Sequence, residues 1–123
     1  SVYGNDYPTP DGTGLRDYLH VMDLARAHAD ALDYLQKTNQ SITANLGAGK
    51  AFSVLDMIHA FQIASGVEIP YEIVGRRQGD VAELYANPDK AKALLNWQTE
   101  FDLKQMCEDA WRWQSNNPDG YGD

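Results

Sequence analysis

The sequence predicts an α/β fold with a small, mostly parallel sheet covered by helices. Short stretches rich in β-branched and aromatic residues alternate with longer stretches whose apolar residues recur at helical spacing. Loops rich in glycine and proline separate the two kinds of stretch. The 123 residues are enough for one domain with a modest core. Strands that alternate with helices usually pair in parallel, so one small sheet is the expected architecture.

The first part of the chain predicts a loop, a strand and a helix. Residues 5–14 hold two prolines and two glycines, which favour a loop. Tyr18, Leu19 and Val21 favour a strand, and Asp23 is a good N-cap for a helix over residues 24–36. An apolar stripe on this helix should face the core, and it consists of Leu24, Ala27, Ala31, Leu32 and Leu35.

A second strand and helix follow over residues 42–64. Residues 42–46 read as a short strand, and a glycine-rich turn comes after it. Ser53 should cap a helix over residues 54–64, with Asp56 three residues later completing a capping box. Gly66 stands where a helix commonly ends in the left-handed conformation.

The last part of the chain predicts two short extended segments and two helices. The extended segments cover residues 70–74 and 84–86, and Asn87-Pro88 should begin a helix that ends near residue 95. Asp102 should cap a final helix over residues 103–116. Its inward-facing residues are predicted to be Leu103, Met106, Cys107, Ala110 and Trp113.

Composition excludes several classes of partner. A net charge of −8 and a pI near 4.6 argue against a surface for nucleic acid or for an anionic membrane. No apolar run is long enough to span a bilayer, and the single Cys107 fits a reducing compartment, so we expect a cytoplasmic protein. In so acidic a chain the arginines are informative. Three of the five lie in two loop-like stretches, namely Arg16, Arg76 and Arg77.

These two stretches are the candidate ligand sites. Arg16 follows a glycine-rich turn and could offer its guanidinium to a phosphate or a carboxylate, or it could pair with Asp17 or Asp6. Residues 75–80 place two arginines and Asp80 between glycines just after a strand, where open α/β sheets bind ligands. Arginine suits a diphosphate and aspartate suits sugar hydroxyls, whereas the alternative is a surface loop with a local ion pair.

Residues 45–49, Asn-Leu-Gly-Ala-Gly, resemble the start of a dinucleotide-binding turn. Glu68 lies at about the right distance for a ribose contact. However, Phe52 stands in place of the third glycine, and Glu68 precedes its strand. A close-packed turn between a strand and a helix is therefore favoured, although the start of the helix at Ser53 could still line a ligand cleft.

No catalytic residue can be nominated from the spacing of reactive side chains. The three histidines, His20, His28 and His59, lack metal-ligand spacing, and Cys107 reads as a core residue. From the residues alone, the prediction is a binding domain compatible with phosphate.

A series of motifs runs in order along the whole chain. They are residues 3–9 (YGNDYPT), 11–14 (DGTG), 16–24 (RDYLHVMDL), 45–47 (NLG), 76–80 (RRQGD), 111–114 (WRWQ) and 117–121 (NPDGY). Together they resemble the C-terminal part of the UDP-glucose 4-epimerase family, which belongs to the extended short-chain dehydrogenases/reductases.

The resemblance implies an activity and a domain organisation. Members of this family interconvert UDP-glucose and UDP-galactose through an NAD-linked 4-keto intermediate. Their NAD site and catalytic residues lie in an N-terminal Rossmann domain. Residues 1–123 are therefore expected to be the UDP-sugar-binding C-terminal domain, inactive alone, with the Rossmann domain and a homodimer of the complete enzyme as expected partners.

The resemblance also implies substrate-binding roles for particular residues. It places Tyr3 beside the uridine, Arg16 and Arg77 on the diphosphate, Tyr18 at a neighbouring substrate contact, Val54 at an apolar contact where a helix begins, Asp80 on the ribose and Leu84 beside the C2 substituent of the sugar. Leu84 departs from the family pattern, in which tyrosine or a small residue is usual.

Two alternatives remain open. One is the substrate domain of another UDP-sugar epimerase or dehydratase, although residues 5–7 and the tail motifs disfavour it. The other is a non-catalytic binding or assembly fragment.

Overall fold

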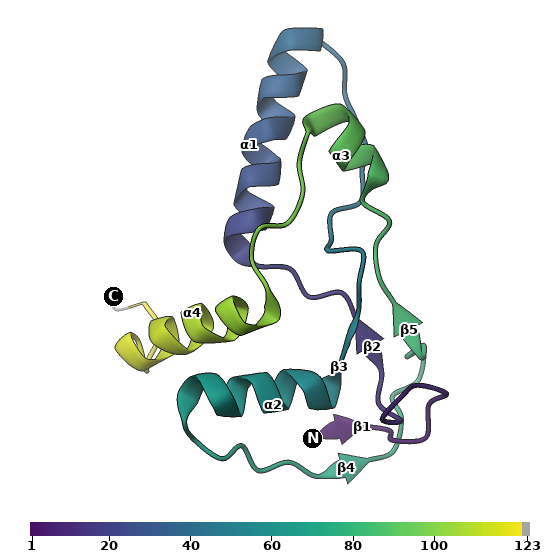
Figure 1. The fold of residues 1–123 in the computed structure, drawn as a ribbon, viewed down its shortest axis with the longest axis vertical. Helices are drawn as coiled ribbons and strands as arrows, with labels where there is room; N and C mark the ends of the chain where they lie inside the picture. The colour runs from purple at the N-terminus through teal and green to yellow at the C-terminus, as the bar shows by residue number, and fades with distance from the viewer. Residues whose placement is uncertain (122–123) are drawn as a thin grey trace.

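The computed structural model describes residues 1–121 as four helices and five very short strands. The helices are α1 (Val21–Thr38), α2 (Val54–Ser65), α3 (Asp89–Leu95) and α4 (Leu103–Asn116). The strands are β1 (Val2–Tyr3), β2 (Leu15–Arg16), β3 (Phe52–Ser53), β4 (Ile73–Val74) and β5 (Glu83–Leu84). Helices α2 and α4 pack together at one end of the molecule, and α1 packs on α3 at the other (Figure 1).

The strands form two small sheets where the sequence predicted one. Strand β1 pairs in parallel with β4, and a separate sheet has the order β3-β2-β5. In that sheet β2 is parallel to β5 and antiparallel to β3. Two of the three pairings are parallel, so the predicted α/β class with a small, mostly parallel sheet is confirmed.

The extents of all four predicted extended segments are wrong. The segment predicted at residues 84–86 forms β5 one residue earlier, at Glu83–Leu84. Strand β2 lies before residues 18–21, and the strand predicted at residues 70–74 is reduced to its last two residues. Residues 42–46 join no sheet, although every second side chain there is half-buried. Ala44 and Leu46 pack against the buried core residues rather than on a neighbouring strand. The alternation of half-buried and exposed side chains at residues 42–46 is therefore caused by packing against the core and not by pairing with a neighbouring strand.

Helix α1 begins three residues earlier than predicted, and its N-cap is His20 instead of Asp23. The Nδ1 atom of His20 accepts the N–H of Met22 at 3.0 Å. Asp23 is fully buried inside the first turn, where its carboxylate accepts the backbone N–H groups of Glu100 and Phe101. The Asp23 carboxylate therefore accepts backbone N–H groups as a capping residue does, but from residues 77 and 78 positions away in the sequence.

The core between α1 and α3 is built around Trp97, which is 1% exposed. Its indole Nε1–H donates to the backbone oxygen of Asp23 at 3.0 Å. Ala27 and Ala91 complete the buried cluster. The predicted stripe on α1 is therefore only partly correct, because the leucines in it (Leu24, Leu32 and Leu35) are all exposed by more than a third.

Helix α2 has the predicted start and end. The Ser53 side chain accepts the N–H of Asp56, and the Asp56 carboxylate accepts the N–H of Ser53. Gly66 ends the helix with φ at +68°, a conformation in which glycine carries no steric penalty. The capping box and the terminal glycine both depend on residues close together in the sequence, which explains why they could be predicted from it.

Helix α4 also begins as predicted, because the Asp102 carboxylate accepts the N–H of Gln105. Only Cys107 among its predicted inward residues is fully buried. Ala110 and Trp113 are exposed at a hollow beside α2. Helix α3 starts two residues after Asn87, whose side chain accepts the N–H of Asp89.

None of the described helices combines the length and apolarity needed to cross a membrane.

Candidate functional site

Two arginines from distant parts of the chain meet at one carboxylate. Arg16 lies in β2, and Arg77 and Asp80 lie in the loop that follows β4. The Arg16 Nη2 atom is 3.5 Å from Asp80 Oδ1, and the Arg77 Nε–H donates to Asp80 Oδ2 at 3.1 Å. The Arg77 side chain remains 62% exposed, so part of its guanidinium faces solvent. The two stretches singled out from the sequence therefore form one site, which we call the arginine cluster (Arg16, Arg77 and Asp80).

Tyr3 lies beside the arginine cluster. The Arg77 guanidinium carbon is 4.7 Å from the centre of the Tyr3 ring, a cation–π distance. Tyr3 is opposite Val74 in the β1–β4 pair, so the loop after Val74 emerges next to its ring. The parallel pairing of β1 with β4 therefore places Arg77 beside the Tyr3 ring.

Leu84 lies directly opposite Arg16 in the β2–β5 pair. The Leu84 side chain is 62% exposed. It lines an open groove of about 580 Å³ together with Arg16, Asp17, Tyr85, Ala86 and residues 44–46. Leu84 and Arg16 therefore line the same open groove.

Val54 and Tyr18 are set apart from this groove. Val54 begins α2 just after β3, which flanks β2 on the side away from β5. Tyr18 lies two residues beyond β2 and lines a different, larger hollow. Burial raises the pKa of the Tyr18 hydroxyl, and the Arg16 charge opposes this to a lesser extent. Tyr18 is therefore a neutral hydrogen-bond donor at neutral pH.

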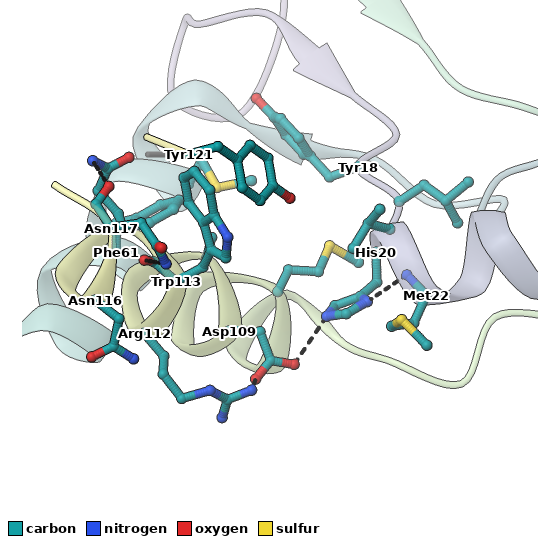
Figure 2. Close-up of a pocket in the computed structure, with 16 residues that line it drawn as sticks. Tyr18, His20, Met22, Phe61, Asp109, Arg112, Trp113, Asn116, Asn117 and Tyr121 are labelled. Carbon is teal, nitrogen blue, oxygen red and sulfur yellow. Dashed lines mark hydrogen bonds and ion pairs between the residues drawn. The ribbon is translucent and has the colours of Figure 1, made fainter. Parts of the chain in front are cut away.

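The larger hollow has a volume of about 830 Å³ and lies between the start of α1, α2 and α4 (Figure 2). Phe61 and Trp113 are among its apolar lining residues. At its edge, His20 and Asp109 are hydrogen-bonded at 3.1 Å. Because His20 Nδ1 accepts the Met22 N–H, the proton of a neutral His20 lies on Nε2, which donates to Asp109.

The neighbouring Arg76 points into a separate contact. Its guanidinium stacks on Tyr7 at 4.0 Å and donates through Nε to Asp6 at 2.7 Å. The pairing of Arg16 with Asp6 or Asp17 that the sequence left open is therefore wrong, because Asp6 is paired with Arg76 and Asp80 is the partner of Arg16. The local Arg77–Asp80 pair does form, but Arg16 shares it.

The glycine-rich turn at residues 47–49 is a close-packed turn, as predicted. Its Ala48 and Gly49 N–H groups, which a dinucleotide phosphate would require, are bound by the Asp17 carboxylate at 2.9 and 3.1 Å. A Cβ on Gly47 would lie 2.4 Å from Asp17 Oδ2. Sequence reasoning missed Asp17, because no local pattern reveals an acceptor whose donors lie 31 or more residues away.

Comparison with known proteins identifies the family. Residues 1–110 match the family model described as GDP-mannose 4,6 dehydratase. The chain belongs to this family. The UDP-glucose 4-epimerase of Neisseria meningitidis serogroup C is 57% identical over all 123 residues, and the Homo sapiens UDP-glucose 4-epimerase is 52% identical over 122. The resemblance to epimerases that the motifs indicated is therefore confirmed.

Solved structures agree with that result. A UDP-glucose 4-epimerase from Stenotrophomonas maltophilia with bound NAD and formylated UDP-arabinopyranose covers 95% of this chain, with 49% identity and a TM-score of 0.92. One from Bifidobacterium longum in complex with NAD+ and UDP covers 98%, with 46% identity and a TM-score of 0.90. The chain spans 35% and 36% of those two structures, and 36% and 35% of the two relatives named above.

Proposed function

We propose that this chain is the C-terminal, UDP-binding part of a UDP-glucose 4-epimerase, the enzyme that interconverts UDP-glucose and UDP-galactose. Relatives that are 57% and 52% identical to it carry that name. The observation that carries the proposal is the arginine cluster, in which two guanidinium groups from distant segments share one carboxylate beside an aromatic ring. These are the groups that recognise a nucleoside diphosphate.

Each group in the cluster has a part in the proposed binding mode. Arg16 and Arg77 hold the diphosphate, and Asp80 accepts a hydrogen bond from a ribose hydroxyl. Tyr3 lies beside the uracil. In the free chain Asp80 balances both arginines, and the phosphates of the ligand take over that charge when UDP binds. The cluster is therefore preorganised for an anion, which lowers the cost of binding.

The remaining predicted residues complete the proposed binding mode, with Val54 and Tyr18 contacting the ligand from outside the groove beside Arg16. Val54 supplies an apolar contact at the start of α2, and Tyr18 donates a hydrogen bond from its neutral hydroxyl. Leu84 borders the sugar, because it lies opposite Arg16 on the neighbouring strand.

The reaction explains why the anchor should grip the diphosphate. Epimerisation at C4 removes a hydride from one face of the sugar and returns it to the other, so the 4-keto intermediate must turn over without escaping. Charge-assisted hydrogen bonds to the unreactive end of the molecule allow this rotation and hold the intermediate in the site. NAD, held by an N-terminal Rossmann domain of the complete enzyme, would supply the hydride transfer.

We also infer that the complete enzyme covers the hollow between α2 and α4. The chain spans about a third of the length of its relatives, and Trp113 in this hollow is 42% exposed. Large apolar surfaces of this kind usually mark an interface.

A cytoplasmic location and a homodimer of the complete enzyme complete the proposal. The free, buried Cys107 is compatible with a reducing compartment.

The test compares the complete polypeptide that carries these residues with the 123-residue chain alone. The complete protein should convert UDP-galactose to UDP-glucose, whereas the chain alone should neither turn over substrate nor retain NAD. A complete protein that binds UDP but converts only an N-acetylated or uronic-acid UDP-sugar would contradict the assignment of substrate. If it binds no nucleotide sugar at all, the epimerase proposal fails.

A further inference from the structure

Asp17 joins three segments of the chain through its carboxylate. Its Oδ1 atom accepts the N–H of Ala48 at 2.9 Å, and its Oδ2 atom accepts the N–H groups of Gly49 and Ala86, both at 3.1 Å. The donors are 31, 32 and 69 residues away in sequence. The backbone N–H of Asp17 also donates to the Leu84 oxygen at 3.1 Å. One half-buried residue therefore fixes the glycine turn and the end of β5 against β2.

The segments that Asp17 holds are the walls of the groove beside Arg16. Residues 44–46 lead into the glycine turn on one side, and residues 84–86 form the other side. The junction has no spare room, since a Cβ on Gly47 would come within 2.4 Å of Asp17 Oδ2 and 2.6 Å of the Ala86 Cβ. A displacement of the carboxylate would thus move both walls.

The same hydrogen bonds keep the charge of Asp17 away from Arg16. Asp17 and Arg16 are adjacent in sequence, yet the negative charge of Asp17 is met by three backbone N–H groups. The Arg16 guanidinium reaches Asp80 instead and donates from Nη1 to the Leu15 oxygen at 2.8 Å. Released from these N–H groups, a side-chain oxygen at position 17, in aspartate or in asparagine, would be able to accept from Arg16 instead.

We propose that Asp17 is a positioning residue for UDP binding, which sets the groove walls and keeps Arg16 available for the diphosphate. This inference rests on the proposed function, because it assigns Asp17 a role in the same site. This position requires a side chain that only accepts hydrogen bonds, because all three of its partners are backbone N–H donors. Asparagine has the same shape, but in either orientation its NH2 group faces at least one backbone N–H.

A double-mutant cycle on the complete protein tests this inference. Calorimetry would measure the Kd values for UDP and for uridine in the unmodified protein, in Asp17→Asn, in Arg16→Ala and in the double variant. We expect Asp17→Asn to weaken UDP binding on the order of tenfold, the equivalent of about one hydrogen bond to a charged group. Uridine binding should change much less, and in the Arg16→Ala background the added effect on UDP should fall below about twofold.

Two further variants separate positioning from general stability. Gly47→Ala displaces the carboxylate without removing it and should reproduce the selective loss of UDP affinity. Asp23→Asn is the control for stability, because Asp23 also accepts backbone N–H groups from a distant segment, and pairs with Arg26, but lies away from the cluster. It should lower the melting temperature and leave the Kd for UDP unchanged.

The outcomes distinguish the two proposals. If UDP binds, Arg16→Ala weakens it and folded Asp17→Asn does not, only the role of Asp17 is overturned. The same holds if the effect of Asp17→Asn is undiminished in the Arg16→Ala background, or if Asp17→Asn and Gly47→Ala both unfold the protein. If the unmodified protein does not bind UDP, the proposed function itself fails.

Discussion

Asp17 and Asp23 make the same kind of hydrogen bond in two different regions of the molecule, with different consequences. Each carboxylate accepts backbone N–H groups from segments far away in the sequence. Asp23 is fully buried, and its own backbone oxygen accepts the Trp97 indole N–H within the core between α1 and α3. Asp17 lies half-buried at the edge of an open groove, next to the arginine cluster.

The surroundings of each carboxylate determine whether its hydrogen bonds contribute mainly to stability or mainly to the shape of the groove. In the core, the hydrogen bonds and the packing of Trp97 act together, so a change there affects the free energy of unfolding. At the groove, solvent reaches the charged groups and screens them, so ion pairs such as Arg77–Asp80 contribute little to stability. Under the proposed function, these ion pairs instead hold a prearranged set of donors for a ligand. The two regions should therefore respond differently to substitution.

The largest effect should come from the core. Replacing Trp97 by alanine removes a side chain that is 1% exposed and leaves a cavity, so we expect a loss of about 3–5 kcal/mol in the free energy of unfolding. Urea unfolding followed by circular dichroism measures this loss. Trp97→Phe should lose less, because most of the apolar volume remains. A loss below about 1 kcal/mol for Trp97→Ala would contradict the assignment of Trp97 as the centre of the core.

The next effect should appear in ligand affinity alone. Arg16→Ala or Arg77→Ala removes hydrogen bonds to a charged partner worth roughly 1.5–3 kcal/mol, which corresponds to about 10- to 150-fold weaker UDP binding. The free energy of unfolding should change by less than about 1 kcal/mol. Calorimetry and urea unfolding on the same preparations check both expectations. Unchanged UDP affinity in both folded variants would reduce these arginines to a surface ion pair.

A smaller effect is expected in substrate choice at the groove. Leucine is larger than the small residues that leave room for an N-acetyl group, so Leu84 should favour UDP-glucose over UDP-N-acetylglucosamine by on the order of 1–3 kcal/mol. The measurement is kcat/KM for both sugars on the complete enzyme, with Leu84→Cys beside it. Equal turnover of the two sugars by the unmodified enzyme would disprove this preference, as would a cysteine variant that gains nothing on the N-acetylated sugar.

The smallest effect is expected at Arg76, the sequence neighbour of Arg77. Its contacts are with Asp6 and Tyr7, outside the arginine cluster. Arg76→Ala should therefore cost no more than about 1 kcal/mol of stability and change UDP affinity by less than about twofold. Arg77→Ala is its matched control in the same assay. Equal losses of affinity in the two variants would show that the site does not distinguish these adjacent side chains.

The sequence by itself determined the features whose causes are local. Ser53, Asp56 and Gly66 bound α2 as predicted, and Asp102 begins α4, because capping partners lie within three or four residues of each other. The motif series likewise identified the epimerase relatives without any structure. The sequence also marked both halves of the arginine cluster, although it left open whether they meet.

Only the tertiary structure decided how distant segments combine. It brought Arg16 and Arg77 to one carboxylate, made His20 rather than Asp23 the cap of α1, and exposed the predicted core residue Trp113. The strands are two residues long, so their pairing is set by the packing of the segments around them rather than by their own composition. Contacts such as those of Asp17, across 31 to 69 residues, leave no periodic signal in the sequence and exist only once the chain has folded.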